Sequence, residues 1–139
     1  MKPHYPNMHR LFQTILTEDA YPGSAVSADL DGDDYDTIPL VTWRAMNDGQ
    51  VDHGKWNVLL IVHVLIDLAE SDMDAVLSHV YAQIQSWNKP GRGVLADEKY
   101  GVLSVEDSAV FNLVNQSMLN GKQVAQFTSQ FRIIVQDWS

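Results

Sequence analysis

The chain contains no cysteine among its 139 residues, which excludes disulfide bonds and thiol catalysis. Basic residues are also few: nine lysines and arginines stand against 18 aspartates and glutamates, and the formal net charge is −9. A protein with this charge repels phosphate backbones and anionic lipid. We therefore expect no specific binding of nucleic acid and no membrane partner.

Long apolar runs are missing as well. The longest covers residues 58–66, far short of the roughly 20 residues that cross a bilayer. The first residues lack the apolar segment of a signal peptide, so the sequence predicts neither a signal peptide nor a transmembrane helix. Hydrophobic residues still make up 45% of the chain, and its length suits one ordinary domain. We expect a single domain over residues 1–139.

Signatures of catalysis are absent from the sequence too. It has no GxGxxG or Walker A pattern, and its five histidines form neither an HExxH nor an HxH motif. The acidic stretch 29–36 begins like a calcium loop, but Asp34 stands where such a loop needs glycine, and Leu40 where it needs glutamate. We interpret it as a solvated turn and expect no metal, no cofactor and no catalytic residue.

Two stretches have the apolar spacing of amphipathic helices. In residues 6–18 the apolar side chains recur every three or four positions, and Pro6 suits a first helical position. A second apolar stripe runs from Val76 to Trp87, and Ser71 with Asp74 ahead of it resembles a capping box. The sequence therefore predicts two helices.

Much of the remaining chain alternates with the period of a strand. The segment 55–66 is apolar on both sides, so we expect a central strand that is covered on both faces. Asn120-Gly121 predicts a hairpin before the last strand. These patterns predict an α+β fold, with two helices on one face of a mostly antiparallel (mixed) sheet of four to five strands. The predicted strands cover residues 25–30, 38–46, 55–66, 108–117 and 122–138, and residues 100–105 are a candidate for a further short strand.

Surfaces for partners are suggested by three features. One side of the last strand is apolar, whereas the other side is polar, as in a half-buried strand. Residues 47–54 form a polar connection that we interpret as an extended loop. Three tryptophans lie at strand or chain ends, and the sequence is compatible both with packing in the core and with contacts at an interface. The polar side carries Gln126, Thr128, Gln130 and Arg132, and the tryptophans are Trp43, Trp56 and Trp138.

The order of these elements is helix, short strand, hairpin with a protruding loop, capped helix and two long terminal strands. It resembles the tail terminator proteins of long-tailed bacteriophages, small proteins in which helices pack on a mostly antiparallel sheet. The stretches that carry the resemblance are Tyr21-Pro-Gly with the strand after it, Ile38-Pro-Leu-Val, residues 80–87 and residues 121–135.

This resemblance implies a virion structural protein, not an enzyme, that assembles in the host cytoplasm as a homohexameric ring. The ring caps the tail tube, stops its polymerisation and joins the tail to the head. Its partners are further copies of itself, the major tail tube protein and the head-completion (stopper) protein, and DNA passes through it. In this picture the polar strand side and the tryptophans form ring contacts, and the tube is contacted by Asn47, Asp48, Gln50, Asp52 and His53.

Two alternatives stay open at this point. The chain is also compatible with another head–tail connector or neck component of similar size. It is compatible too with a small ligand-binding or enzymatic α+β domain, whose cavity between sheet and helices would be lined by His63 or Tyr81.

Overall fold

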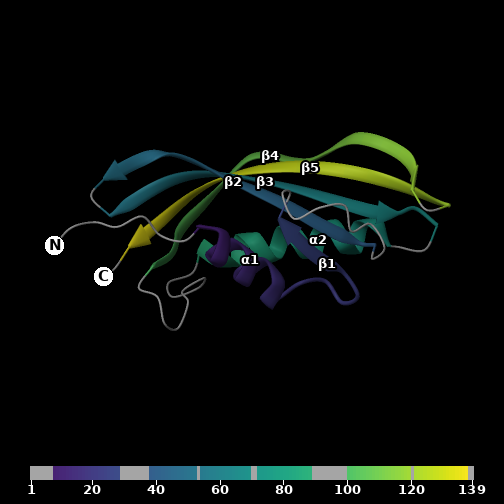
Figure 1. The fold of residues 1–139 in the computed structure, drawn as a ribbon, viewed down its shortest axis with the longest axis horizontal. Coiled ribbons are helices and arrows are strands. Elements are labelled where there is room, and N and C mark those ends of the chain that lie inside the picture. Colours follow the sequence, from purple (N-terminus) through teal and green to yellow (C-terminus); the bar gives the residue numbers. More distant parts are fainter. Residues whose placement is uncertain are drawn as a thin grey trace.

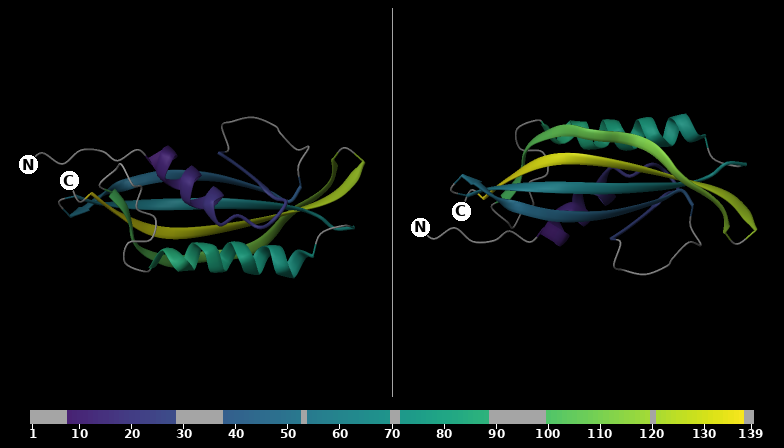
Figure 2. Two further views of the ribbon diagram at one scale, coloured as in Figure 1. Left: turned by 90° about the horizontal axis from the view of Figure 1, so that it is seen from below. Right: turned by 90° about the horizontal axis from the view of Figure 1, so that it is seen from above.

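The fold is α+β, as the sequence predicts: two α-helices lie on one face of a five-stranded mixed sheet (Figures 1 and 2). The computed structural model describes residues 8–28, 38–52, 54–69, 72–88, 100–119 and 121–137. No helix in these ranges is both long enough and apolar enough to span a membrane. The elements are α1 (Met8–Glu18), β1 (Ala25–Ala28), β2 (Leu40–Asp52), β3 (Lys55–Asp67), α2 (Met73–Gln85), the 3-10 helix η2 (Ser86–Asn88), β4 (Tyr100–Leu119) and β5 (Lys122–Asp137).

The strand order is β1-β2-β3-β5-β4, in which β1 pairs parallel to β2 and every other pair is antiparallel. The central position predicted for β3 is confirmed. Its helix-facing side chains are fully buried against the apolar faces of α1 and α2, because burial of apolar area drives the two layers together. The buried β3 residues on this face are Val58, Leu60, Val62, Val64 and Ile66.

The prediction that β3 is covered on both faces is wrong for the second face. Both helices lie on the same side, and Leu59 and His63 on the other side are only half-buried. Ile61 on this side is only 9% exposed, although no described helix lies above it. The side chains of Arg44 and Gln130 on the two neighbouring strands flank it and account for its burial. The apolar pattern of β3 therefore reflects cover by neighbouring side chains, not by a second layer.

Helix α2 begins one residue later than the predicted capping box implies. Asp72 is the N-cap residue, and its Oδ1 accepts a hydrogen bond from the backbone N–H of Ala75 at 3.2 Å. Ser71 lies outside the described residues. An aspartate cap also places negative charge at the positive end of the helix dipole, which explains why this position suits Asp72.

A buried glutamine joins the two helices. Gln83 of α2 is 7% exposed, and its Nε2 donates to the carbonyl oxygens of Ile15 at 3.0 Å and Leu16 at 2.9 Å. These carbonyls belong to the last turn of α1, where the helix itself offers no hydrogen-bond donor. Gln83 thus supplies the missing donors and fixes α1 against α2.

Strand β4 is one continuous strand, whereas the sequence predicts one strand at 108–117 and a separate candidate at 100–105. It is four residues longer than its partner β5, 20 against 16, and four register shifts absorb the difference. Phe111, at one of these shifts, has a φ of 37°, a backbone angle that residues other than glycine rarely adopt. Such bulges interrupt the alternation of apolar and polar residues. The sequence pattern is therefore interrupted at residues where the strand itself continues.

Residues 47–52 are also strand, where the sequence predicts an extended loop. Strand β2 continues to Asp52 and β3 starts at Lys55, so the two form a long hairpin with a short turn. Two register shifts near Gly49, whose φ is 113°, explain the mismatch: the irregular pairing and polar side chains hide the strand from its sequence pattern.

We predict that replacing Gln83 with methionine destabilises the fold by about 1–3 kcal/mol, because two buried carbonyl oxygens lose their donor while the side-chain volume stays the same. Urea unfolding followed by circular dichroism measures the difference. Gln123→Met is the matched control, since Gln123 is exposed and its loss should leave the free energy of unfolding nearly unchanged. Equal unfolding free energies for the two variants would contradict the proposed role of Gln83.

Candidate interaction surface

The face of the sheet that the helices leave open is the first candidate surface. Gln126, Thr128 and Gln130 are half-buried on it and Arg132 is exposed, and all four lie on the side of β5 away from the helices. The predicted division of this strand into an apolar and a polar side is confirmed. These candidate residues therefore do share one accessible face.

A small polar network crosses β3 and β5 on this open face. Nδ1 of His63 lies 2.8 Å from Oγ1 of Thr128 and 3.4 Å from Nε2 of Gln126. His63 is thus a hydrogen-bonded histidine on the open face. The ligand-binding alternative expects a cavity between sheet and helices lined by His63 or Tyr81; His63 lies on the face away from the helices, whereas Tyr81 of α2 lines a groove between α2 and β4.

Two arginines lie on the open face, in a protein with a net charge of −9. Arg44 of β2 is paired with Ile61, and Arg132 of β5 is paired with Leu59. Glu106 of β4 lies opposite Arg132 on the same face. The acidic N-cap of α2, Asp72, belongs to the helical layer. The open face is therefore less acidic than the chain as a whole.

The outer edge of β4 is the second candidate surface, and its first half is covered. The side-chain amide of Asn88 bonds to both backbone groups of Val105, accepting from the N–H at 2.6 Å and donating to the carbonyl oxygen at 3.1 Å. Asp107 accepts a hydrogen bond from Tyr81 Oη at 2.6 Å and another from Gln85 Nε2. Residues of α2 and η2 thus bind the strand up to Asp107.

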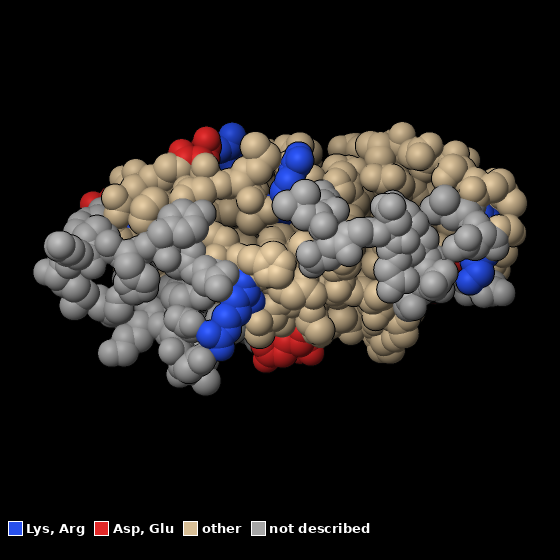
Figure 3. Space-filling view, in the orientation of Figure 1, with Lys and Arg blue, Asp and Glu red and all other residues tan. Residues whose placement is uncertain are grey.

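The second half of this edge, residues 108–118, has no such cover from the described residues. It carries no charged residue and no proline, although charged residues make up 19% of the chain. Leu113, Val114 and Met118 are 50%, 55% and 66% exposed. In Figure 3 the β4–β5 hairpin, at the upper right, shows almost no charged side chains. Natural edge strands usually carry charges or prolines that prevent pairing with another chain, and these are missing here.

A shallow apolar groove of about 310 Å³ lies beside this edge, between α2 and β4. It is lined by Leu77, Ser78 and Tyr81 from the helix and by Val110 and Phe111 from the strand. The bulge at Phe111 turns these two neighbouring strand residues toward the helix side, which forms the wall of the groove. The groove offers one hydroxyl from Ser78 and one from Tyr81, and its remaining lining is apolar.

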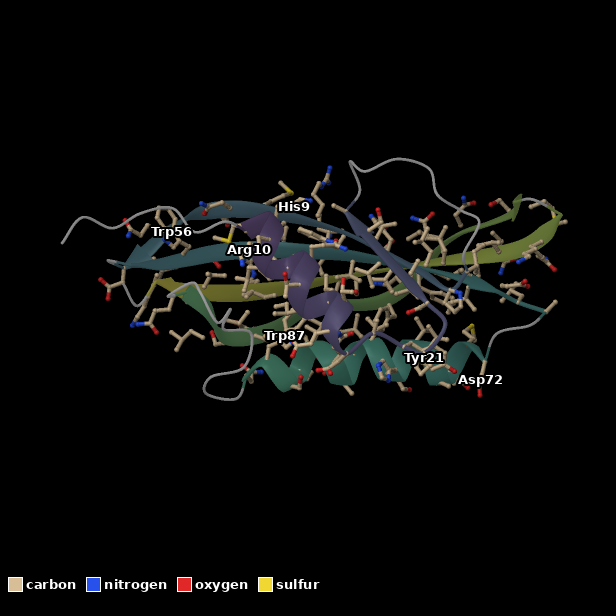
Figure 4. All side chains as sticks on the ribbon, turned by 60° about the horizontal axis from the view of Figure 1, so that its bottom comes forward. His9, Arg10, Tyr21, Trp56, Asp72 and Trp87 are labelled. Atoms are coloured by element: carbon tan, nitrogen blue, oxygen red, sulfur yellow. The ribbon has the colours of Figure 1, made fainter. Side chains whose placement is uncertain are left out.

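The tryptophans considered as interface residues have different environments. Trp43 is 3% exposed in the core, contacts the ring of Phe12 and donates from Nε1 to Gln13 Oε1 at 2.7 Å. It offers no surface to a partner. Trp56 is half-buried near the β2–β3 hairpin, and Trp87 is buried between sheet and helices (Figure 4). Trp138 lies outside the described residues.

The residues expected to contact the tail tube lie on the arm formed by the end of β2. Asn47, Asp48, Gln50 and Asp52 are all exposed there, on a strand and not on a loop. His53 lies outside the described residues. Oδ1 of Asn47 accepts a hydrogen bond from the N–H of Gly49 at 2.9 Å, which fixes the bulge in this arm. The arm is accordingly a more ordered projection than the sequence predicts.

Sequence reasoning missed the free half of the β4 edge. The uncharged run 108–118 is visible in the sequence, but its meaning depends on the strand order, which places β4 at the edge of the sheet. Comparisons with known proteins do not add to this picture: no protein-family model matches the chain, and no curated protein matches it significantly.

Tyr81 gives this region a predicted alkaline sensitivity. Its hydrogen bond to the Asp107 carboxylate raises the pKa of the phenol, because ionisation would place two negative charges side by side. The resulting stabilisation is fully present below the unfolded-state pKa of about 10 and is lost as the pH rises through the higher folded-state pKa. We expect the unfolding free energy of the wild type to fall more steeply above pH 10 than that of Tyr81→Phe.

Urea unfolding at several pH values between 8 and about 11.5 tests this expectation. Tyr21→Phe is the matched control, because it removes a phenol hydroxyl from another half-buried tyrosine and leaves the Tyr81–Asp107 bond in place. Identical slopes for wild type and Tyr81→Phe would show that the Tyr81–Asp107 bond does not contribute to stability.

Proposed function

We propose that this protein is a virion structural protein that assembles as a ring, caps a bacteriophage tail tube and provides the surface to which the head is joined. The observation that carries the proposal is the uncharged edge of β4 at residues 108–118, which no described strand or helix covers with hydrogen bonds. A lone chain with such an edge is prone to pair with other chains. A ring of identical subunits satisfies every such edge and then stops, because it closes.

The fold supports the same proposal. The sequence resembles phage tail terminators in the order of its elements, and the arrangement expected from them, helices on one face of a mostly antiparallel sheet, is the one present here. Two hairpins extend from opposite ends of the sheet, β2–β3 at one end and β4–β5 at the other (Figure 1). A ring built from such subunits has projections available for the tube on one side and for the head-completion protein on the other.

The charge distribution refines which face has which role. DNA that passes through a ring is not held back when the lining is acidic, and the net charge of −9 favours such a channel. The open face carries Arg44 and Arg132, so we assign it to contacts with neighbouring subunits or rings and not to an acidic lining. Its polar network around His63 and Thr128 suits a contact that excludes only part of the water.

Light scattering and electron microscopy of the purified protein test the proposal, followed by mixing with polymerising tail tube subunits. We expect a closed oligomer, and tubes that carry a ring at one end and stop growing. A monomer that forms no rings and does not associate with tubes would contradict the proposal. Rings that bind the head-completion protein but never a tube would instead favour another neck component.

We further predict that Gln130→Glu combined with Arg132→Glu weakens assembly at least tenfold while the chain stays folded. The two changes add three negative charges to a contact face of a protein whose subunits already repel one another. Thr14→Glu with Arg10→Glu is the matched control, because it changes the charge equally on the exposed side of α1. Unchanged assembly of the Gln130/Arg132 variant would show that the open face is not a contact.

A further inference from the structure

We propose that residues 108–118 of β4 pair with residues 44–51 of β2 in a second copy of this chain, which extends the sheet from one subunit to the next. The inference rests on the proposed function in one respect, that the assembly of paired copies closes into a ring. The pairing itself follows from the two sheet edges of the single chain.

Beyond the short strand β1, no described strand covers the outer edge of β2. Strand β1 pairs only with residues 40–43, and β2 then continues alone on that side. Met46 and Val51 on this part are 47% and 61% exposed. The sheet thus has two edge segments that no described strand covers, one on each of its sides, and each carries exposed apolar side chains.

Strand β1 itself is a poor partner for β4. It has four residues, and the carbonyl oxygen of Val26 in its centre already accepts a hydrogen bond from Gln13 Nε2 at 3.0 Å. Residues 44–51 match the length of 108–118 much better. Helix α1 therefore already binds the β1 segment of that sheet edge through Gln13. Residues 44–51 of β2 are the segment of the same edge that remains for a second copy.

Strand directions favour this pairing as well. Because β2-β3-β5-β4 are antiparallel at each step, β4 runs opposite to β2. Copies related by rotation around a ring keep the same orientation along its axis, so β4 of one subunit meets β2 of the next antiparallel. Antiparallel ladders are the more stable kind and need no crossover connection.

The positions of the two segments set the relation between copies. The free part of β2 lies at the β2–β3 hairpin and the free part of β4 at the β4–β5 hairpin, at opposite ends of the molecule (Figures 1 and 2). Paired copies are therefore staggered along the strand direction, and closure requires strands tilted to the ring axis, as in a barrel.

Self-pairing of two β4 edges about a twofold axis is the main competing arrangement. Such a dimer covers Leu113, Val114 and Met118 but leaves Met46 and Val51 of both subunits exposed. Pairing β4 with β2 covers both edge segments, with their exposed apolar side chains, in every subunit. Because residues 108–118 carry no charge, the pairing places no like charge opposite Arg44 or Asp48 of the second copy.

Engineered cysteines test the pairing cleanly, since the chain has none of its own. Val114→Cys is mixed in turn with Met46→Cys, Asn47→Cys and Asp48→Cys under mild oxidation, and a disulfide forms only where the Cα atoms approach to about 6 Å. We expect the disulfide between the two different variants in at least one mixture to exceed the Val114→Cys homodimer several-fold. Predominant Val114→Cys homodimers, or no cross-link in any mixture, would overturn the proposal.

A second variant keeps the test independent of cross-linking. Val114→Lys with Met118→Lys places charges on the edge and should reduce self-association at least tenfold with an unchanged circular dichroism spectrum. Leu68→Lys, at an exposed apolar site in the turn after β3, is the control and should assemble normally. Unimpaired assembly of the double lysine variant would contradict the pairing.

The outcomes separate this inference from the proposed function. Rings that cap tubes but give no β4–β2 cross-link would refute the edge pairing and leave the capping role intact. Cross-linked open chains that never cap a tube would support the edge pairing and refute the capping role.

Discussion

Burial of one face of β3 is the interaction on which the rest of the structure depends. Its five helix-facing side chains, from Val58 to Ile66, are fully buried, and each contributes about 1.5–3 kcal/mol through loss of apolar surface to water. This burial draws α1 and α2 to the same side of the sheet, where Gln83 then joins them. The described residues form no third layer on the other side, and the open face follows directly from this.

The uncovered edges follow from the same arrangement. Two short helices cover the middle of a sheet whose outer strands extend beyond them, so the hairpins project from both ends. On the β4 side, Asn88, Tyr81 and Gln85 hold the strand only as far as Asp107. The uncharged continuation is poorly suited to a lone chain in water and well suited to a contact with another copy.

Much of the fold could be predicted from the sequence, because its helices and β3 and β5 are governed by regular local patterns. The division of β5 into a buried and an open side followed from alternation alone. Where bulges interrupt alternation, as in β4 near Phe111 and in β2 near Gly49, the same rule failed and predicted a break or a loop.

The candidate surface was harder to predict than the fold. The burial of Trp43 depends on α1 lying over β2, and the free edge of β4 depends on strand order; neither is encoded in a local pattern. Gln126 to Arg132 could be found, since they belong to a single strand. Which distant strands pair with one another cannot be predicted from the local patterns of a single sequence.

Amide hydrogen exchange tests the central claim, that the outer edge of β4 at residues 108–118 lacks a partner strand in the single chain and gains one in an assembly. The exchange is measured for dilute monomer and for assembled protein. The account predicts fast exchange in the monomer for those amides of residues 108–118 that point away from β5, and strong protection of these amides after assembly. The amides of the same segment that point toward β5, and residues 124–135 of β5, are protected in both states. Fast exchange of the outward-pointing amides in the assembled protein, or their full protection already in the monomer, would contradict it.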